Sequence, residues 1–79
     1  MAAITQAKVL EALRAEGGTA TGWALTFRLY GVGEHRTDFH RYCEVMRRVR
    51  ELRQDGRLEV VGQADPKGGR PPLLFREVV

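Results

Sequence analysis

The chain has 79 residues, of which 43% are hydrophobic and 29% are charged, and its formal net charge is +3. This composition is typical of a folded protein rather than a disordered one, and the length predicts one domain, residues 1–79, with a core too small for a large enzyme. No apolar run approaches the roughly 20 residues that cross a bilayer, so we do not expect a membrane-spanning protein. No secretory leader is evident, so we do not expect a secreted protein. Cys43 is the single cysteine, which excludes a disulfide scaffold.

The first predicted helix covers about residues 5–16. Thr5 is suited to cap it, because a threonine hydroxyl accepts a hydrogen bond from a free amide of the first turn. Its predicted apolar face consists of Ala7, Leu10 and Leu13, with Ile4 packing beside them. Gly17 and Gly18 end the helix, since glycine readily adopts the left-handed conformation found at helix C-termini.

Residues 19–21 are predicted to be extended, either as a link or as a strand of one or two residues. Thr21 then caps a second predicted helix, about residues 22–30, which Gly31 closes. Capping explains Thr21 as well as the alternative, in which the helix N-terminus holds a phosphate. The side chains expected to pack this helix are Trp23, Ala24 and Phe27, with Leu25 and Leu29 as further candidates.

The third predicted helix covers about residues 38–55, begins at a cap formed by Thr37 or Asp38, and stops at Gly56. Its apolar stripe consists of Tyr42, Val45, Val49 and Leu52, flanked by Phe39 and Met46. The side chains predicted on the opposite face are His40, Arg41, Glu44, Arg47, Arg48 and Glu51.

The positive charge is concentrated in this helix. Residues 36–57 contain seven arginines and four acidic residues, whereas the charges on either side of this segment cancel, so the whole excess lies here. A concentrated basic patch attracts polyanions, and arginine is suited to forked contacts with phosphates and guanine edges. The alternative is a solvated helix face in a protein of arginine-biased composition.

Beyond Gly56 the apolar pattern becomes that of strands. Residues 58–61 and 73–77 are predicted strands, and the connection 62–72 is rich in glycine, proline and charge. The order helix, extended link, helix, helix, strand, loop, strand predicts an α+β fold. Specifically, it predicts a winged helix-turn-helix with three helices and a C-terminal two-stranded β wing.

Two segments resemble winged-helix regulators. Residues 45–61 resemble the end of the recognition helix and the first wing strand, through the spacing of Leu52, Gly56 and Leu58. The later Gly-Arg-Pro sequence, residues 69–71, is similar to the element that begins the second wing strand in PadR-like and MarR-like regulators. The resemblance covers residues 36–79, and residues 4–31 by element order alone.

The resemblance implies a small, sequence-specific protein that binds double-stranded DNA, a transcriptional regulator located in the cytoplasm at the nucleoid. Helix 38–55 would enter the major groove, and the wing 62–72 would lie on the backbone or in the minor groove. Dimerisation and effector binding do not carry over, because the chain lacks the extra terminal helices that serve them in the larger regulators. A homodimer therefore remains one alternative beside a monomer.

The candidate DNA-contacting residues are Arg36, His40, Arg41, Glu44, Arg47 and Arg48 in the helix, and Lys67 and Arg70 in the wing. Arg41 and Arg47 suit guanine or phosphate, whereas Glu44 either accepts from cytosine or pairs with a neighbouring arginine. Arg50 and Arg53 are expected to support the helix C-terminus. Lys67 and Arg70 flank two glycines that permit a close backbone approach, although a solvated hairpin tip would look the same.

Other chemistry is weakly supported by the sequence. His35, His40 and Cys43 lack the fourth ligand of a structural zinc site, and Cys43 lacks the partners of a catalytic nucleophile, so it is expected to be a half-buried helix residue. We therefore expect no catalysis, no metal, no cofactor and no small-molecule ligand. The alternative function is a winged-helix adaptor that docks an acidic protein partner.

Overall fold

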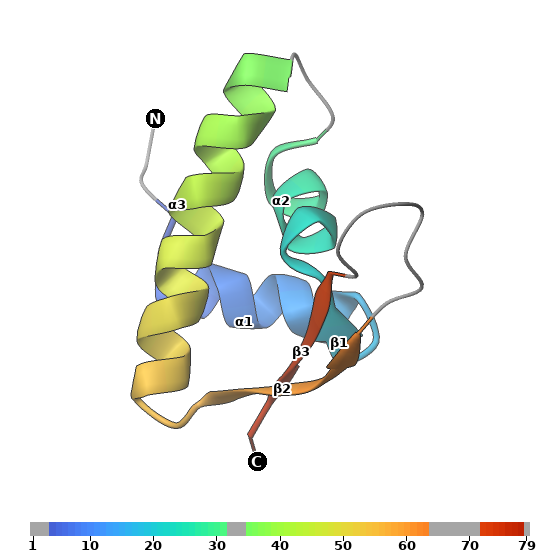
Figure 1. Cartoon of the computed structure of the whole chain (residues 1–79), viewed down its shortest axis with the longest axis vertical. Coiled ribbons are helices and arrows are strands. Elements are labelled where there is room, and N and C mark those ends of the chain that lie inside the picture. The colour runs from blue at the N-terminus through green and yellow to red at the C-terminus, as the bar shows by residue number, and fades with distance from the viewer. Residues whose placement is uncertain (1–3, 32–34, 64–71, 79) are drawn as a thin grey trace.

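The fold is seen in a computed structural model that describes residues 4–31, 35–63 and 72–78, and the side chains of all of these except residues 35–37. Three helices pack with a three-stranded antiparallel sheet. In chain order the elements are α1 (Gln6–Ala15), β1 (Thr19–Ala20), α2 (Gly22–Tyr30), α3 (His35–Gln54), β2 (Leu58–Gln63) and β3 (Leu73–Glu77). Figure 1 shows α1 crossing α3, with the sheet beside the C-terminal end of α3.

The first two helices begin at threonine caps, as the sequence predicts. The Thr5 hydroxyl accepts from the amide of Lys8 at 3.2 Å, and the Thr21 hydroxyl accepts from the amide of Ala24 at 3.1 Å. Each bond satisfies one of the amides that a helix N-terminus leaves without a partner. Gly31, with φ of 79°, ends α2 in a conformation that side chains other than glycine rarely adopt.

The third helix begins earlier than predicted. It starts at His35, so the expected caps Thr37 and Asp38 lie inside its first turn. An acidic residue is favourable in that turn because the free amides there carry partial positive charge. The sequence prediction was wrong because aspartate is common both as a cap and in the first turn, and the pattern does not distinguish the two positions.

The sheet has one strand more than the two-stranded wing predicted from the sequence. β1 pairs with β3 through Ala20 and Phe75, and β2 pairs with the other edge of β3, giving the order β1-β3-β2. β2 also runs two residues past the predicted end, to Gln63. A register shift between Val60 and Gly62 lets the ladder continue, since a bulge accommodates Gly62, which the sequence places in the connection after the strand.

The core lies where the three helices meet the sheet. Its buried apolar side chains are Ile4, Val9, Leu10, Ala12, Leu13, Ala20, Leu25, Val45, Val49, Leu52, Leu58 and Phe75. The prediction was correct for Leu10 and Leu13 on α1 and wrong for Ala7, which is exposed. Val45, Val49 and Leu52 confirm the predicted stripe of α3, and Tyr42 and Met46 are half-buried, but the prediction was wrong for Phe39, which is exposed.

The side of α2 that faces the core also differs from the prediction. Leu25 and Thr26 are fully buried, and the Thr26 hydroxyl donates to the carbonyl of Gly22 at 2.8 Å. Trp23 is only half-buried and Phe27 is exposed, although their bulk suggested the opposite. Aromatic residues also lie on the sides of α2 that are not buried, so side-chain size alone did not identify the side that faces the core.

Candidate nucleic-acid interface

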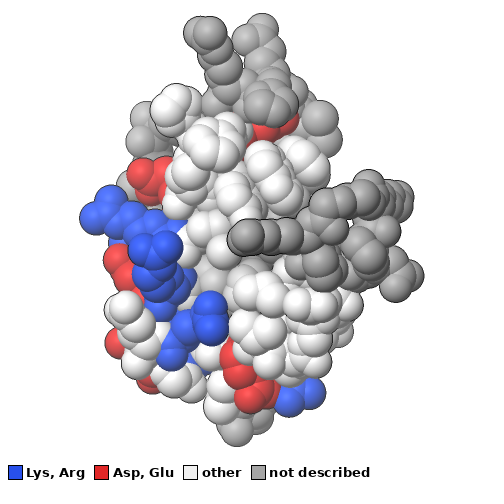
Figure 2. Space-filling view, in the orientation of Figure 1, with Lys and Arg blue, Asp and Glu red and all other residues white. Residues whose placement is uncertain are grey.

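The solvent side of α3 is set by its three fully buried residues, Val45, Val49 and Leu52. Because an α-helix has 3.6 residues per turn, these three residues lie on one side of the helix. That side faces the core, and the opposite side faces solvent. We call the exposed side chains of α3 the outer face, which comprises Phe39, His40, Cys43, Glu44, Arg47, Arg50, Arg53 and Gln54. Figure 2 shows basic side chains gathered along α3 on the side in view.

Three arginines outside α3 are paired with carboxylates, whereas Arg57, just after α3, forms no ion pair with a described side chain. These ion pairs are Arg14 with Glu77, Arg28 with Glu16, and Arg76 with Glu59. On the outer face, Arg47 and Arg50 have no carboxylate within ion-pair distance among the described side chains. Both side chains are exposed to solvent without a contact ion pair, although the charge of Arg47 acts on Glu51 at longer range.

Arg48 lies on a different side of α3 from its neighbour Arg47. It is half-buried, and its Nε donates to the Ile4 carbonyl at 3.0 Å while Nη1 donates to Glu51 Oε1 at 2.8 Å. Gln6 Nε2 donates to the same Glu51 oxygen at 3.2 Å. These hydrogen bonds, with Arg48 the largest contributor, lower the pKa of Glu51.

This network joins the beginning of α1 to α3, which corrects the sequence prediction that placed Arg48 with the groove-facing residues. One residue along a helix is a turn of about 100°, which is enough to move a side chain from the solvent side to the side facing α1. The spacing of three between Arg48 and Glu51 was the available signal for such a pair.

Arg41 and Glu44 both lie near Tyr30 of α2. Arg41 is half-buried, with its guanidinium carbon 5.0 Å from the centre of the Tyr30 ring, a cation–π arrangement. Burial raises the pKa of Tyr30, Glu44 raises it further, and Arg41 acts in the opposite direction. Glu44 forms no ion pair with a described side chain, so the intrahelical pair that the sequence allowed is not found there.

The C-terminal part of α3 carries candidates that the sequence assigned only to helix support. Arg50 and Arg53 are exposed and line a groove of about 560 Å³ between α3 and β2, together with Val60. Arg53 also lies over the Phe75 ring, 6.0 Å from its centre. The signal that could have indicated this is the spacing of three from Arg47 to Arg50 and again to Arg53, which extends the basic surface along the helix.

The remaining predicted contacts are only partly described. His40 is exposed on the outer face, one residue from Phe39. Arg36 belongs to α3, but its side chain lies outside the described residues, as do Lys67 and Arg70 of the predicted wing. The wing contacts therefore stay predictions. Of the whole connection 62–72, the structure describes Gly62 and Gln63 in β2 and Pro72 before β3.

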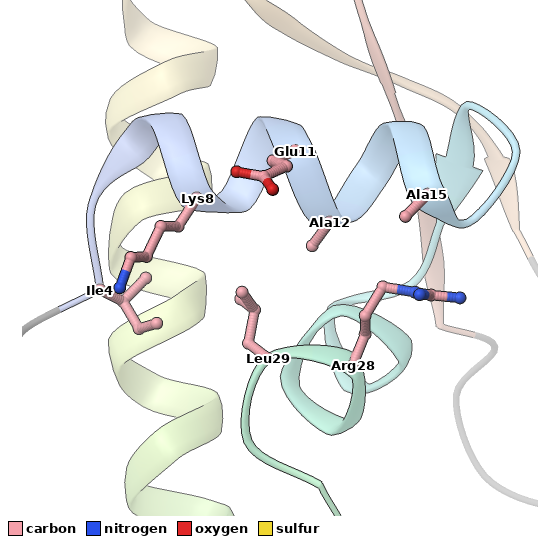
Figure 3. A pocket seen from close by; sticks show the side chains of 7 residues that line it. All are labelled: Ile4, Lys8, Glu11, Ala12, Ala15, Arg28 and Leu29. Atoms are coloured by element: carbon pink, nitrogen blue, oxygen red, sulfur yellow. The ribbon is translucent and has the colours of Figure 1, made fainter.

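A second surface feature is a hollow of about 350 Å³ between α1 and α2. Figure 3 shows Leu29 of α2 extending toward α1 and the Ala12 side chain facing the hollow, whereas the Arg28 guanidinium points away from Lys8. Arg28 is held by Glu16, with Nε 2.6 Å from the carboxylate oxygen.

Other kinds of site are absent from the part of the chain that the structure describes. No three histidine, cysteine or acidic side chains gather there in a way that could hold a metal ion, and none of its helices is long and apolar enough to cross a membrane. Cys43 is exposed rather than half-buried, which corrects the prediction for it. Comparison of the chain with protein-family models, curated proteins and solved structures found no match.

Proposed function

We propose that this protein is a winged helix-turn-helix domain that binds double-stranded DNA in a sequence-specific manner, as a transcriptional regulator. α3 would enter the major groove, and the hairpin of β2 and β3 would form the wing, with its connection along the neighbouring backbone or minor groove. The order of elements supports this assignment, because the hairpin follows α3 directly and its last strand pairs with β1.

The observation that carries the proposal is the contrast between paired and unpaired arginines. Away from α3, Arg14, Arg28 and Arg76 are each joined to a carboxylate. On the outer face, Arg47 and Arg50 are exposed without such a partner among the described side chains. A helix face with unneutralised guanidinium groups fits a row of phosphates and guanine edges.

The side chains would divide the work by their position. His40, in the second turn of α3, would meet base edges, because the first turns of a recognition helix lie deepest in the groove. Arg47, two turns further along the outer face, would contact guanine or a phosphate. Arg50 and Arg53 would contact phosphates beside the groove that they line with β2. Arg48 is omitted from this surface because its donors are used by Ile4 and Glu51.

The test is binding of labelled duplexes at low salt, followed by selection from a random pool to find the preferred sequence. We expect the logarithm of affinity to fall linearly with the logarithm of salt concentration, with a slope of about −0.9 per phosphate neutralised. Arg47→Ala should weaken binding, and if Arg47 contacts a phosphate it should also reduce the slope by about one phosphate. The symmetry of the selected site would show whether one or two copies bind.

Lys8→Ala is a matched control, because Lys8 is exposed on α1 and forms no ion pair with a described side chain. It removes the same charge from a different surface, so it should leave DNA binding nearly unchanged. If the wild-type protein binds no duplex at low salt, or if both substitutions weaken binding equally, the proposed interface is wrong.

A protein adaptor is the second candidate, and the exposure of Phe27 on α2 and of Phe39 on the outer face favours it. Aromatic residues and arginine are both enriched at the centres of protein interfaces. The distinguishing measurement is a pull-down with nuclease treatment. An acidic protein partner would be retained after the nucleic acid is digested, whereas a partner bridged by DNA would be lost.

A further inference from the structure

Phe39 is the most exposed large hydrophobic side chain in the described part of the chain, with 52% of its surface accessible. It lies in the second turn of α3, outside the group of buried residues that forms the core. A phenylalanine in this position contributes little of the free energy that full burial would give. Its presence on the helix is therefore not explained by packing.

The position of Phe39 connects it with the basic part of the outer face. Residues four and seven apart follow one side of a helix, and the exposed residues Phe39, Cys43 and Arg50 have this spacing. Arg50 stands at the far end of the row, about 16 Å along the axis at 1.5 Å per residue. Phe39 is thus an apolar group at the N-terminal end of a face whose other end carries unpaired positive charge.

A polyanion attracted by those arginines would bring its surface against Phe39 as well. In the major groove of duplex DNA, thymine differs from every other unmodified base by its C5-methyl group, which is the apolar feature a phenyl ring can contact. Phosphates and base nitrogens offer no such contact. The group that suits an exposed phenyl ring on a positively charged helix face is therefore a 5-methylpyrimidine.

We infer that Phe39 is a specificity-determining residue that packs on the C5-methyl group of a pyrimidine in the major groove. This inference rests on the proposed DNA-binding function and adds to it a base preference at one position of the site. The pyrimidine is thymine in ordinary DNA, and 5-methylcytosine presents the same methyl group. Removing the methyl group should weaken binding by about fourfold, the factor that corresponds to roughly 0.8 kcal/mol for one buried carbon.

The experiment measures the dissociation constants of the wild-type protein and Phe39→Ala for one selected duplex by fluorescence anisotropy. Each thymine is replaced singly by deoxyuracil, which lacks only the methyl group. The wild-type protein should lose about fourfold at one position, and Phe39→Ala should bind the thymine and uracil duplexes equally. In a second arm, cytosine at that position is compared with 5-methylcytosine, and the wild-type protein should prefer the methylated base.

Val78→Ala is the control, because Val78 is also an exposed apolar residue, 43% accessible, and lies after β3 away from α3. It should keep the full preference of the wild-type protein for thymine over uracil. Circular dichroism and the fluorescence of Trp23, the single tryptophan, confirm that each variant is folded.

The outcomes separate the two proposals. If the wild-type protein binds the duplex but no thymine-to-uracil change alters its affinity, the role of Phe39 is wrong and the DNA-binding function stands. The same conclusion holds if Phe39→Ala keeps the wild-type preference for thymine. If the wild-type protein binds no duplex at all, the proposed function fails, and the inference about Phe39 fails with it.

Discussion

Gly22 of α2 packs closely against Tyr42 and Met46 of α3, and replacing it by alanine tests how much room this contact between the helices has. Gly22 is buried at the start of α2, and a Cβ atom there would overlap Met46 Sδ and lie 2.9 Å from Cε2 of Tyr42. Both distances are well inside the roughly 3.5–4.0 Å that is optimal for such contacts. Met46 can move because it is flexible, but the Tyr42 ring is stacked on Trp23 at 4.3 Å between centroids.

We expect Gly22→Ala to destabilise the protein by about 1–2 kcal/mol. Overpacking of this kind costs about 1–3 kcal/mol, and the higher helix propensity of alanine returns at most about 1 kcal/mol. The melting temperature should fall by about 5–15 °C, since 1 kcal/mol corresponds to roughly 4–8 °C in a domain of this size. Urea unfolding followed by Trp23 fluorescence measures the change and also reports displacement of the stacked Tyr42 ring.

Gly62→Ala is the matched control. The same substitution in β2 places a Cβ with no atom within 4 Å, and the φ angle of Gly62 is not positive. Because alanine restricts the unfolded chain, this variant should be unchanged or more stable by about 0.4–1 kcal/mol. If Gly22→Ala proves as stable as Gly62→Ala, the reasoning is refuted, and the α2–α3 contact has room that the distances do not indicate.

Two further predictions concern stability. Thr21→Ala should cost about 1 kcal/mol by removing the hydrogen bond to the Ala24 amide, whereas Thr21→Ser, which keeps the hydroxyl, should retain most of the wild-type urea midpoint. Hydrogen bonds from Arg48 and Arg14 lower the pKa of Glu51 and Glu77 respectively below the ordinary value of 4.5, so the native state binds fewer protons than the unfolded one. The resulting stabilisation is complete above pH 4.5 and is lost as the pH falls through the native pKa. Glu77→Gln removes one of the two carboxylates, so the urea midpoint of this variant should decline less steeply in acid. An unchanged decline would contradict this assignment.

Local signals predicted the helices better than they predicted their packing. The threonine hydroxyls at Thr5 and Thr21 act on amides three residues away, so their effect is visible in a short stretch of sequence. The pairing of Ala20 with Phe75 joins residues far apart in the chain. No short-range pattern contains that contact, which is why the third strand was only an alternative in the sequence and the wing was expected to have two.

The candidate interface divides in the same way. The periodicity of Val45, Val49 and Leu52 placed Arg47 on the solvent side correctly. It did not separate Arg47 from Arg48, because the bond from Arg48 to the Ile4 carbonyl spans 44 positions of the chain. Helical periodicity identifies the side of α3 that faces the core. Only the position of α1 determines which arginine forms hydrogen bonds within the protein.

The ion pairs among the described side chains also explain why unpaired positive charge is found on the outer face of α3. A charge paired at contact distance forms a dipole, whose field falls off with distance faster than that of a single charge, and salt screens both over a Debye length of about 8 Å at physiological salt. Arg14 and Arg76 are paired with Glu77 and Glu59, so they stabilise the packing of α1 and the sheet while adding little to the distant field. Arg47 and Arg50 keep more of their field because no described carboxylate forms a contact ion pair with them. A substitution in the first group should therefore affect mainly folding, and one in the second mainly association, so the two roles can be separated by experiment.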